Sequence, residues 1–344
     1  MGTSALPCLR PAASTAGEGP PMSVIPSTRP SLAWLAAATA TVALLSLGTT
    51  AAPAYPGHTV SRYMPLSGNT SDISTARSAG CDAGRTGRSG VRILFFGTQE
   101  RGGRLRPPGT TRDSTAPRVA ATRAIRVTAA WARGFSSCRT RGATADVALG
   151  VNNKDDNGLR GGTAGTAWAR IVNEAASSAR TPAVTIAGAV DAEPSWSSPA
   201  WARGWARAFT TTSTRPLYTA SSADGCPTYG SASVACANGW TLADVHYVAT
   251  GASAQIRAIP QIYRTDGIQA RQWARISSWG ARQGPGTVRF AGSLSQHVAC
   301  RQRGGCARTN NTAKAAWTQL RDALNAHPET RVSALPNATD VRWP

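Results

Sequence analysis

Two carboxylates, Asp191 and Glu193, directly follow an apolar segment that spans residues 184–190. Side chains of a β-strand alternate between its two faces, so both acids would point the same way, with Ala189 beneath them. Glycoside hydrolysis needs a carboxylic acid that protonates the leaving oxygen and a second group that supports an oxocarbenium-like transition state. Glu193 is the candidate general acid, and Asp191 is the charged neighbour that would raise its pKa. A solvated pair that only caps the next helix is the alternative.

Further side chains that suit a sugar substrate lie near the ends of the expected strands. Aromatic rings stack on the C–H faces of sugars while an indole N–H or a phenol O–H binds hydroxyl groups. The aromatic candidates are Trp196, Trp240, Tyr247 and Tyr263. The polar candidates are Asn152, Asn153, Asp224, Gln261 and Gln296. For each residue taken singly, core packing or a structural role is the alternative.

Other kinds of catalysis have little support in the sequence. It contains neither a G-x-S-x-G nucleophile motif nor a C-x-x-C pair. Its four histidines lack the spacing of metal ligands: His58, His246, His297 and His327. The glycine-rich segment 161–165 does not follow a strand directly, as a phosphate-binding loop would. We therefore expect no metal site and no cofactor.

Short apolar segments alternate with amphipathic ones, which predicts repeated βα units and a parallel sheet. The expected strands span residues 91–96, 145–151, 183–190, 216–220, 245–250, 257–263 and 288–294. The expected helices span residues 116–135, 165–178, a segment that begins at Pro199, 266–279 and 312–326. Seven strands are one short of eight, and the missing strand would lie in residues 55–90 or near 331–335. The predicted fold is an α/β (βα)8 TIM-like barrel, incomplete or irregular, and an open doubly wound sheet is the alternative.

The N-terminal region has the pattern of a secretory signal. An apolar segment at residues 32–47 follows Arg29 and precedes Ala52-Pro53-Ala54, which predicts a signal peptide over residues 1–54 and a secreted protein. Met22 lies closer to the apolar segment, so residues 1–21 could be an artefact of an upstream start. An uncleaved anchor is the alternative, but we expect no stable membrane span after cleavage. Residues 55–90 are polar and glycine-rich and predict a flexible arm, which leaves residues 91–344 for the barrel domain.

Six cysteines follow the predicted cleavage site, and an even number in an exported chain indicates disulfides. Fifteen pairings of six cysteines are possible. The short spacings favour Cys226 with Cys236 and Cys300 with Cys306, which leaves Cys81 with Cys138. These bonds would staple the loops of the domain.

The chain is strongly basic, with 37 lysines and arginines, 17 acidic residues and a net charge of +20. Only Lys154 and Lys314 are lysines. A basic secreted protein would be held near anionic cell-wall polymers. The arginines neither form one dense run nor interleave with aromatic residues, so we expect no specific binding of nucleic acid. We also expect a monomer.

Four segments resemble uncharacterised secreted actinobacterial proteins with a glycosidase-like TIM barrel: 187–196, 222–226, 238–244 and 300–306. The resemblance covers residues 90–344 and implies the fold and the exported setting. More distantly, the acidic strand is similar to that of chitinase-like glycosidases and barrel muramidases, which implies Glu193 as proton donor and Asp191 as assisting carboxylate. Two features depart from those patterns: Ala189 stands where chitinase-like enzymes have a further Asp, and the first strand ends in Phe96-Gly97-Thr-Gln99 without an acid.

The leading hypothesis is a secreted barrel hydrolase that acts on a polysaccharide, with Glu193 as general acid. A secreted barrel that binds glycan or cell-wall polymer without hydrolysing it is the main alternative. A third hypothesis is a wall-associated structural protein whose arginine-rich arm, residues 55–90, does the binding.

Overall fold

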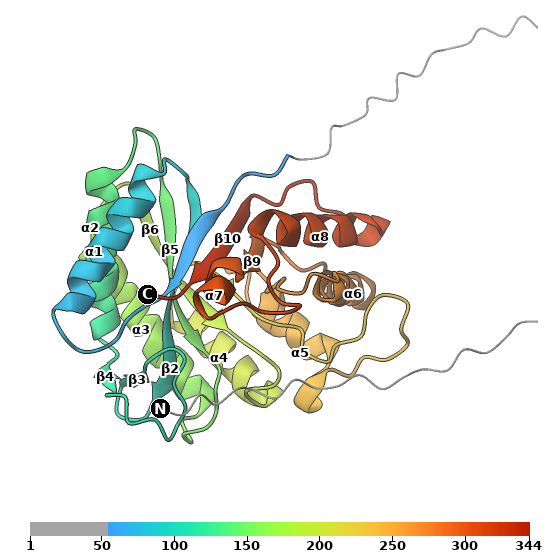
Figure 1. Ribbon diagram of the computed structural model, residues 1–344. Coiled ribbons are helices and arrows are strands. Elements are labelled where there is room, and N and C mark those ends of the chain that lie inside the picture. The colour runs from blue at the N-terminus through green and yellow to red at the C-terminus, as the bar shows by residue number, and fades with distance from the viewer. Residues whose placement is uncertain (1–53) are drawn as a thin grey trace, which may run out of the picture. The chain divides into compact units, whose positions relative to one another are not determined.

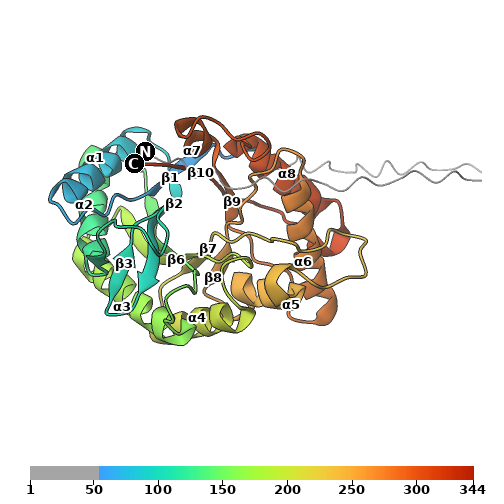
Figure 2. The ribbon, with the colours of Figure 1, turned by 60° about the horizontal axis from the view of Figure 1, so that its bottom comes forward.

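The computed structural model describes residues 54–344, in which eight parallel strands form a nearly closed barrel (Figures 1 and 2). In order around the barrel the strands are β8 (Ile256–Ala258), β7 (Leu217–Thr219), β6 (Val184–Asp191), β5 (Ala145–Asn152), β2 (Gly90–Glu100), β1 (Thr59–Tyr63), β10 (Asn337–Arg342) and β9 (Gly292–Ser295). Isolated parallel bridges from Ala258 to Phe290 and from Gln261 to Leu294 connect the two ends of this order. The predicted α/β TIM-like barrel is therefore confirmed.

Helices surround the barrel (Figure 2). They are α1 (Ser71–Arg85), α2 (Arg123–Cys138), α3 (Gly161–Ala179), α4 (Pro199–Thr212), α5 (Leu242–His246), α6 (Ile268–Gln283), α7 (His297–Gln302) and α8 (Ala313–Asn325). A small antiparallel extension, β3 (Arg104–Arg106) and β4 (Val119–Ala120), continues from β2. Large side chains fill the layer between strands and helices, among them five tryptophans that are at most 1 % exposed: Trp131, Trp168, Trp205, Trp273 and Trp317. No helix within residues 54–344 is long and apolar enough to cross a membrane.

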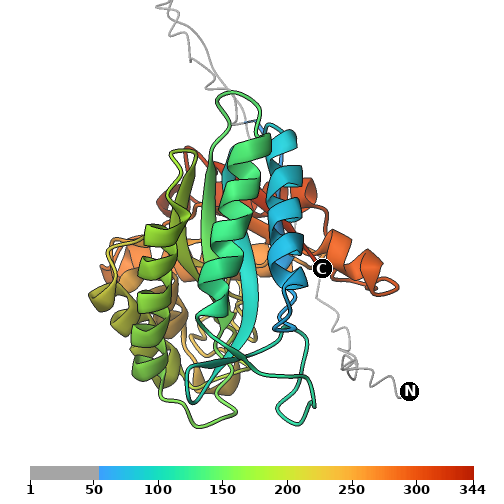
Figure 3. The same cartoon turned by 90° about the vertical axis from the view of Figure 1, so that its left-hand side faces the viewer.

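The predicted flexible arm is wrong, because residues 55–90 contain the first βα unit of the barrel. Strand β1 pairs with both β2 and β10, and α1 packs beside α2 (Figure 3). A Cβ atom added to Gly80 would lie 2.0 Å from the backbone oxygen of Trp131, and one added to Gly134 would lie 2.0 Å from that of Arg77. Gly80, one of the glycines that suggested disorder, thus allows α1 and α2 to approach closely, together with Gly134 of α2. The barrel begins at β1 rather than at residue 91, and residues 1–53 of the predicted signal peptide lie outside the described residues.

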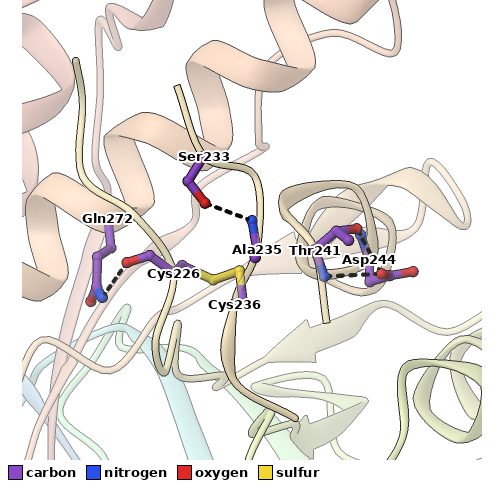
Figure 4. Close-up of a disulfide and its surroundings, with 7 residues drawn as sticks. All are labelled: Cys226, Ser233, Ala235, Cys236, Thr241, Asp244 and Gln272. Carbon is purple, nitrogen blue, oxygen red and sulfur yellow. Dashed lines mark hydrogen bonds between the residues drawn. A yellow bond between two sulfur atoms is a disulfide. The ribbon is translucent and has the colours of Figure 1, made fainter. Parts of the chain in front are cut away.

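The strand predicted at residues 245–250 is also wrong. This segment lies in α5 and in the π-helical turn that follows it, Tyr247–Gly251. Thr241 and Asp244 form a capping box at the start of α5, with the Asp244 side chain accepting from the Thr241 amide at 3.1 Å (Figure 4). Such a box nucleates a helix, which overrides the strand preference of the apolar residues behind it. The barrel reaches eight strands through β1 and through β10, which begins just after the expected 331–335.

Three disulfides join the predicted pairs of cysteines: Cys81–Cys138, Cys226–Cys236 and Cys300–Cys306. The first ties α1 to the end of α2. The second closes a loop of the β7–α5 segment, where Gln272 of α6 donates to the Cys226 backbone oxygen at 2.7 Å (Figure 4). The third closes the turn that follows α7.

Candidate functional site

The candidate site lies where the parallel strands end at the C-terminal mouth of the barrel. Asn152 at the end of β5 pairs in register with Asp191 at the end of β6. The Asp191 side chain is buried, with 6 % exposure, and Glu193 is half-buried just beyond the strand. Ser198 caps the following helix, accepting from the Trp201 amide at 3.3 Å. The alternative that the acidic pair serves as the cap of α4 is therefore wrong.

One amide nitrogen bridges the two carboxylates. Nε2 of Gln261 donates to Oδ1 of Asp191 at 2.7 Å and to Oε1 of Glu193 at 2.9 Å. The same nitrogen lies 3.1 Å from the backbone oxygen of Ala220 at the end of β7. Both carboxylates therefore reach a single point, Asp191 from the end of β6 and Glu193 from the loop after it, and Gln261 reaches the same point from the segment after β8.

Burial raises the pKa of the Asp191 carboxyl to about 7. The pKa of Glu193 is raised well above its ordinary value, chiefly by burial and then by the neighbouring charge of Asp191. The hydrogen bond from Gln261 and the positive charge of Lys154 act in the opposite direction on both groups. Two acids this close cannot both ionise easily, so the pair retains a proton near neutral pH.

The loop that carries Glu193 is held by buried hydrogen bonds to Asn153. Oδ1 of Asn153 accepts from the Glu193 amide at 2.9 Å, and Nδ2 donates to the Glu193 backbone oxygen at 3.0 Å and to Ser197 Oγ at 2.7 Å. Asn153 is fully buried, so it positions this loop and does not face a substrate. Trp240 has a similar role, because its buried indole donates to the Ser197 backbone oxygen at 2.7 Å.

A pocket of about 170 Å³ opens beside the acidic pair. Three predicted site residues line it: Asn152, Asp191 and Trp196. Asp191 is the only carboxylate among residues 54–344 that lines this pocket, and Glu193 shares the Gln261 amide with it. The other walls are Tyr63, Phe95, Gly97, Pro108, Gly109, Lys154 and Trp343.

Three of these walls are aromatic residues that sequence reasoning missed. The ring of Tyr63 stacks on Trp343 with centroids 4.1 Å apart and lies 5.3 Å from that of Phe95. Tyr63 ends β1 and Trp343 follows β10, the two strands that were not assigned from the sequence. Assigning residues 59–63 and 337–342 as strands would have found both, because each aromatic residue stands at a C-terminal strand end.

Two further predicted residues, Tyr263 and Asp224, interact electrostatically with the acidic pair. Burial raises the pKa of the Tyr263 phenol, and the charges of Tyr63, Asp191 and Glu193 raise it further. Tyr263 packs against the same apolar cluster as Tyr63 and Trp343. Asp224 accepts from Ser195 Oγ at 3.0 Å, and its charge raises the pKa of both acids.

Two predicted site residues have other contacts. Tyr247 lies under the guanidinium of Arg203, with Arg203 Cζ 4.0 Å from the ring centroid, in a groove between α4 and α5 that is separate from the pocket. Tyr247 therefore does not line the pocket beside the acidic pair, and its role in substrate binding stays a prediction. Gln296 donates to the Thr309 backbone oxygen at 2.9 Å and so holds the loop after α7.

Within residues 54–344 no group of three or more His, Cys, Asp or Glu side chains is arranged to hold a metal ion. No protein-family model matches the chain, and no curated protein matches it either.

Proposed function

We propose that the protein is a secreted glycoside hydrolase that acts on a polysaccharide, such as a cell-wall glycan, with Glu193 as general acid. The observation that carries this proposal is the Gln261 amide, which bridges Asp191 and Glu193 at the mouth of the barrel. Side chains at this end of a TIM barrel are where such folds carry their chemistry. A carboxyl group kept protonated near neutral pH is what a general acid requires.

In the proposed step, protonated Glu193 gives its proton to the glycosidic oxygen. The bond from the anomeric carbon to that oxygen breaks, and its electron pair stays with the departing sugar. Positive charge then develops on the anomeric carbon and the ring oxygen, where the carboxylate of Asp191 stabilises it. Water adds to the anomeric carbon and returns a proton to Glu193, which restores the acid.

The exported setting has two supports. Three disulfides indicate an oxidising compartment, in which such bonds persist. The apolar segment at residues 32–47 with its flanking arginine and alanines has the pattern of a secretory signal.

A specific observation favours a second candidate function, glycan binding without hydrolysis. Asp191 lines the pocket, whereas Glu193 is absent from its walls. If Glu193 does not reach the glycosidic oxygen of a bound glycan, the same pocket would hold the glycan and leave it intact.

The test is release of reducing sugar by the purified protein from chitin, peptidoglycan, and plant and bacterial glycans. We expect release by the wild type, a loss of at least about 100-fold in Glu193→Gln, and no loss in Glu174→Gln, whose carboxylate is exposed on α3. Unchanged binding by Glu193→Gln would show that only the chemistry is lost. Activity retained in Glu193→Gln but abolished in Asp191→Asn would contradict the assignment of the acid. No release from any substrate, with binding preserved, would favour the second function.

A further inference from the structure

On the side of the pocket next to β10, the Arg303 guanidinium lies on the ring of Trp343. The ring of Trp343 stacks on Tyr63, and Arg303 Cζ lies 3.6 Å from the Trp343 ring centroid. A Cβ atom added to Gly109, which also lines the pocket, would lie 3.1 Å from Arg303 Nη2. A ring engaged in two stacking contacts has little free face for a sugar. Trp343 therefore holds the guanidinium of Arg303 at the edge of the pocket.

A second cation on an aromatic ring stands across the mouth. Lys154 Nζ lies 4.8 Å from the ring centroid of Trp196, and both residues line the pocket. Trp196 follows β6, whereas Trp343 follows β10. Strands β6 and β10 stand four places apart in the eight-strand order, which puts them on opposite sides of the barrel. The charge of Lys154 acts on both site carboxyls, and Arg303 lies on the β10 side of the pocket.

Both cations have donors available for a ligand. Neither the Lys154 ammonium nor the Arg303 guanidinium forms an ion pair or a side-chain hydrogen bond within residues 54–344. Asp191 and Glu193 accept from the neutral amide of Gln261 instead. Other arginines of the chain do pair with acids: Arg106 contacts Asp156 at 2.6 Å. Ammonium and guanidinium groups held on rings keep N–H donors free for an anion.

We infer that the pocket accepts an acidic glycan, and that Lys154 in the pocket wall and Arg303 at the pocket edge bind carboxylate or phosphate groups on its sugar units. This inference rests on the proposed function only in that the same pocket receives a glycan. A retained proton on the acidic pair reduces its repulsion of such a ligand. The two cations provide charge-assisted contacts that a neutral glycan cannot use.

The test is binding by the Glu193→Gln protein, measured by calorimetric titration, so that hydrolysis does not interfere. The probes are N-acetylglucosamine oligomers, uronic acid oligomers and a phosphodiester-linked glycan. We expect tighter binding of at least one acidic probe, and the carboxylate and phosphate arms identify which acid is preferred. Adding Lys154→Met or Arg303→Gln should weaken binding of that probe by about tenfold and leave the neutral oligomer unchanged.

Matched controls are Lys314→Met on α8, the other lysine, and Arg301→Gln, an exposed arginine near Arg303. A loss in the controls equal to that in the Lys154 and Arg303 variants would overturn the inference, since it would show only an effect of net charge. Equal affinity for neutral and acidic probes, or binding of none, would also overturn it. A preference for acidic probes in a protein that releases no sugar would contradict the proposed hydrolysis and support the binding of acidic groups by Lys154 and Arg303.

Discussion

Asn153 and Glu193 are joined by two reciprocal hydrogen bonds between the side chain of one and the backbone of the other, at 2.9 and 3.0 Å. Asn153 follows β5, and Glu193 follows β6. The clamp therefore ties the loops of two neighbouring strands and fixes the backbone of the proposed acid. The Glu193 carboxylate itself is positioned by the hydrogen bond that it accepts from Gln261.

Asn153→Ala should reduce the free energy of unfolding by about 1–3 kcal/mol, because it leaves buried partners in the 193–197 loop unsatisfied. Urea unfolding measures this change. Asn310→Ala, at an exposed position, is the control. In hydrolysis we expect kcat to fall more than KM rises, because the clamp positions the acid and does not touch substrate. An unaltered kcat in a destabilised variant would contradict this role.

Gln261→Met should raise the pKa of both site carboxyls, because the amide donates to their charged forms and thereby lowers both values. The alkaline limb of the pH profile of kcat/KM would then move to higher pH. Carbon NMR titration of the two carboxyls measures the same shift without activity. Gln283→Met at the end of α6 should leave the profile unchanged. A shift to lower pH would contradict the proposed bridge.

Asp191→Asn should gain stability relative to the wild type as pH rises. Burial raises the pKa of Asp191 from 3.8 to about 7, so the folded state holds a proton that the unfolded state has lost between these values. The contribution of Asp191 is therefore fully present below the lower value and lost as pH rises through the upper one. The difference should grow by about 1.4 kcal/mol for each unit of pKa shift. Urea unfolding at about pH 4 and pH 8 measures it, and a constant difference would contradict the raised pKa.

Removal of Cys81–Cys138 should destabilise the protein more than removal of Cys300–Cys306. The first bond spans 57 residues and the second only 6. In the chain-entropy model these loops correspond to about 4 and about 2 kcal/mol. Urea unfolding of the two double serine variants provides the comparison. Equal losses would indicate that loop entropy does not determine the stability of this barrel.

Local signals predicted much of the barrel correctly. Residues 184–190 read as an apolar strand that ends in acids, and they form β6 with Asp191 at its end. The predictions failed where a local signal was misleading or weak. The apolar residues after Thr241 resembled a strand but followed a capping box. The glycines of α1 suggested disorder, but they allow a close contact with the backbone of α2. The sequence of α1 alone does not reveal that contact, because it depends on the position of α2.

The sequence by itself favoured the observed pairing of the cysteines, the common direction of Asp191 and Glu193, and the barrel over an open sheet. These properties depend on spacing along the chain, so short-range patterns carry them. Only the tertiary structure decided which side chains surround the pair. Gln261 bridges the acids across 70 and 68 residues, and Trp343 reaches Tyr63 from the other end of the domain. Such contacts arise only when the barrel closes and brings the ends of all eight strands to one mouth.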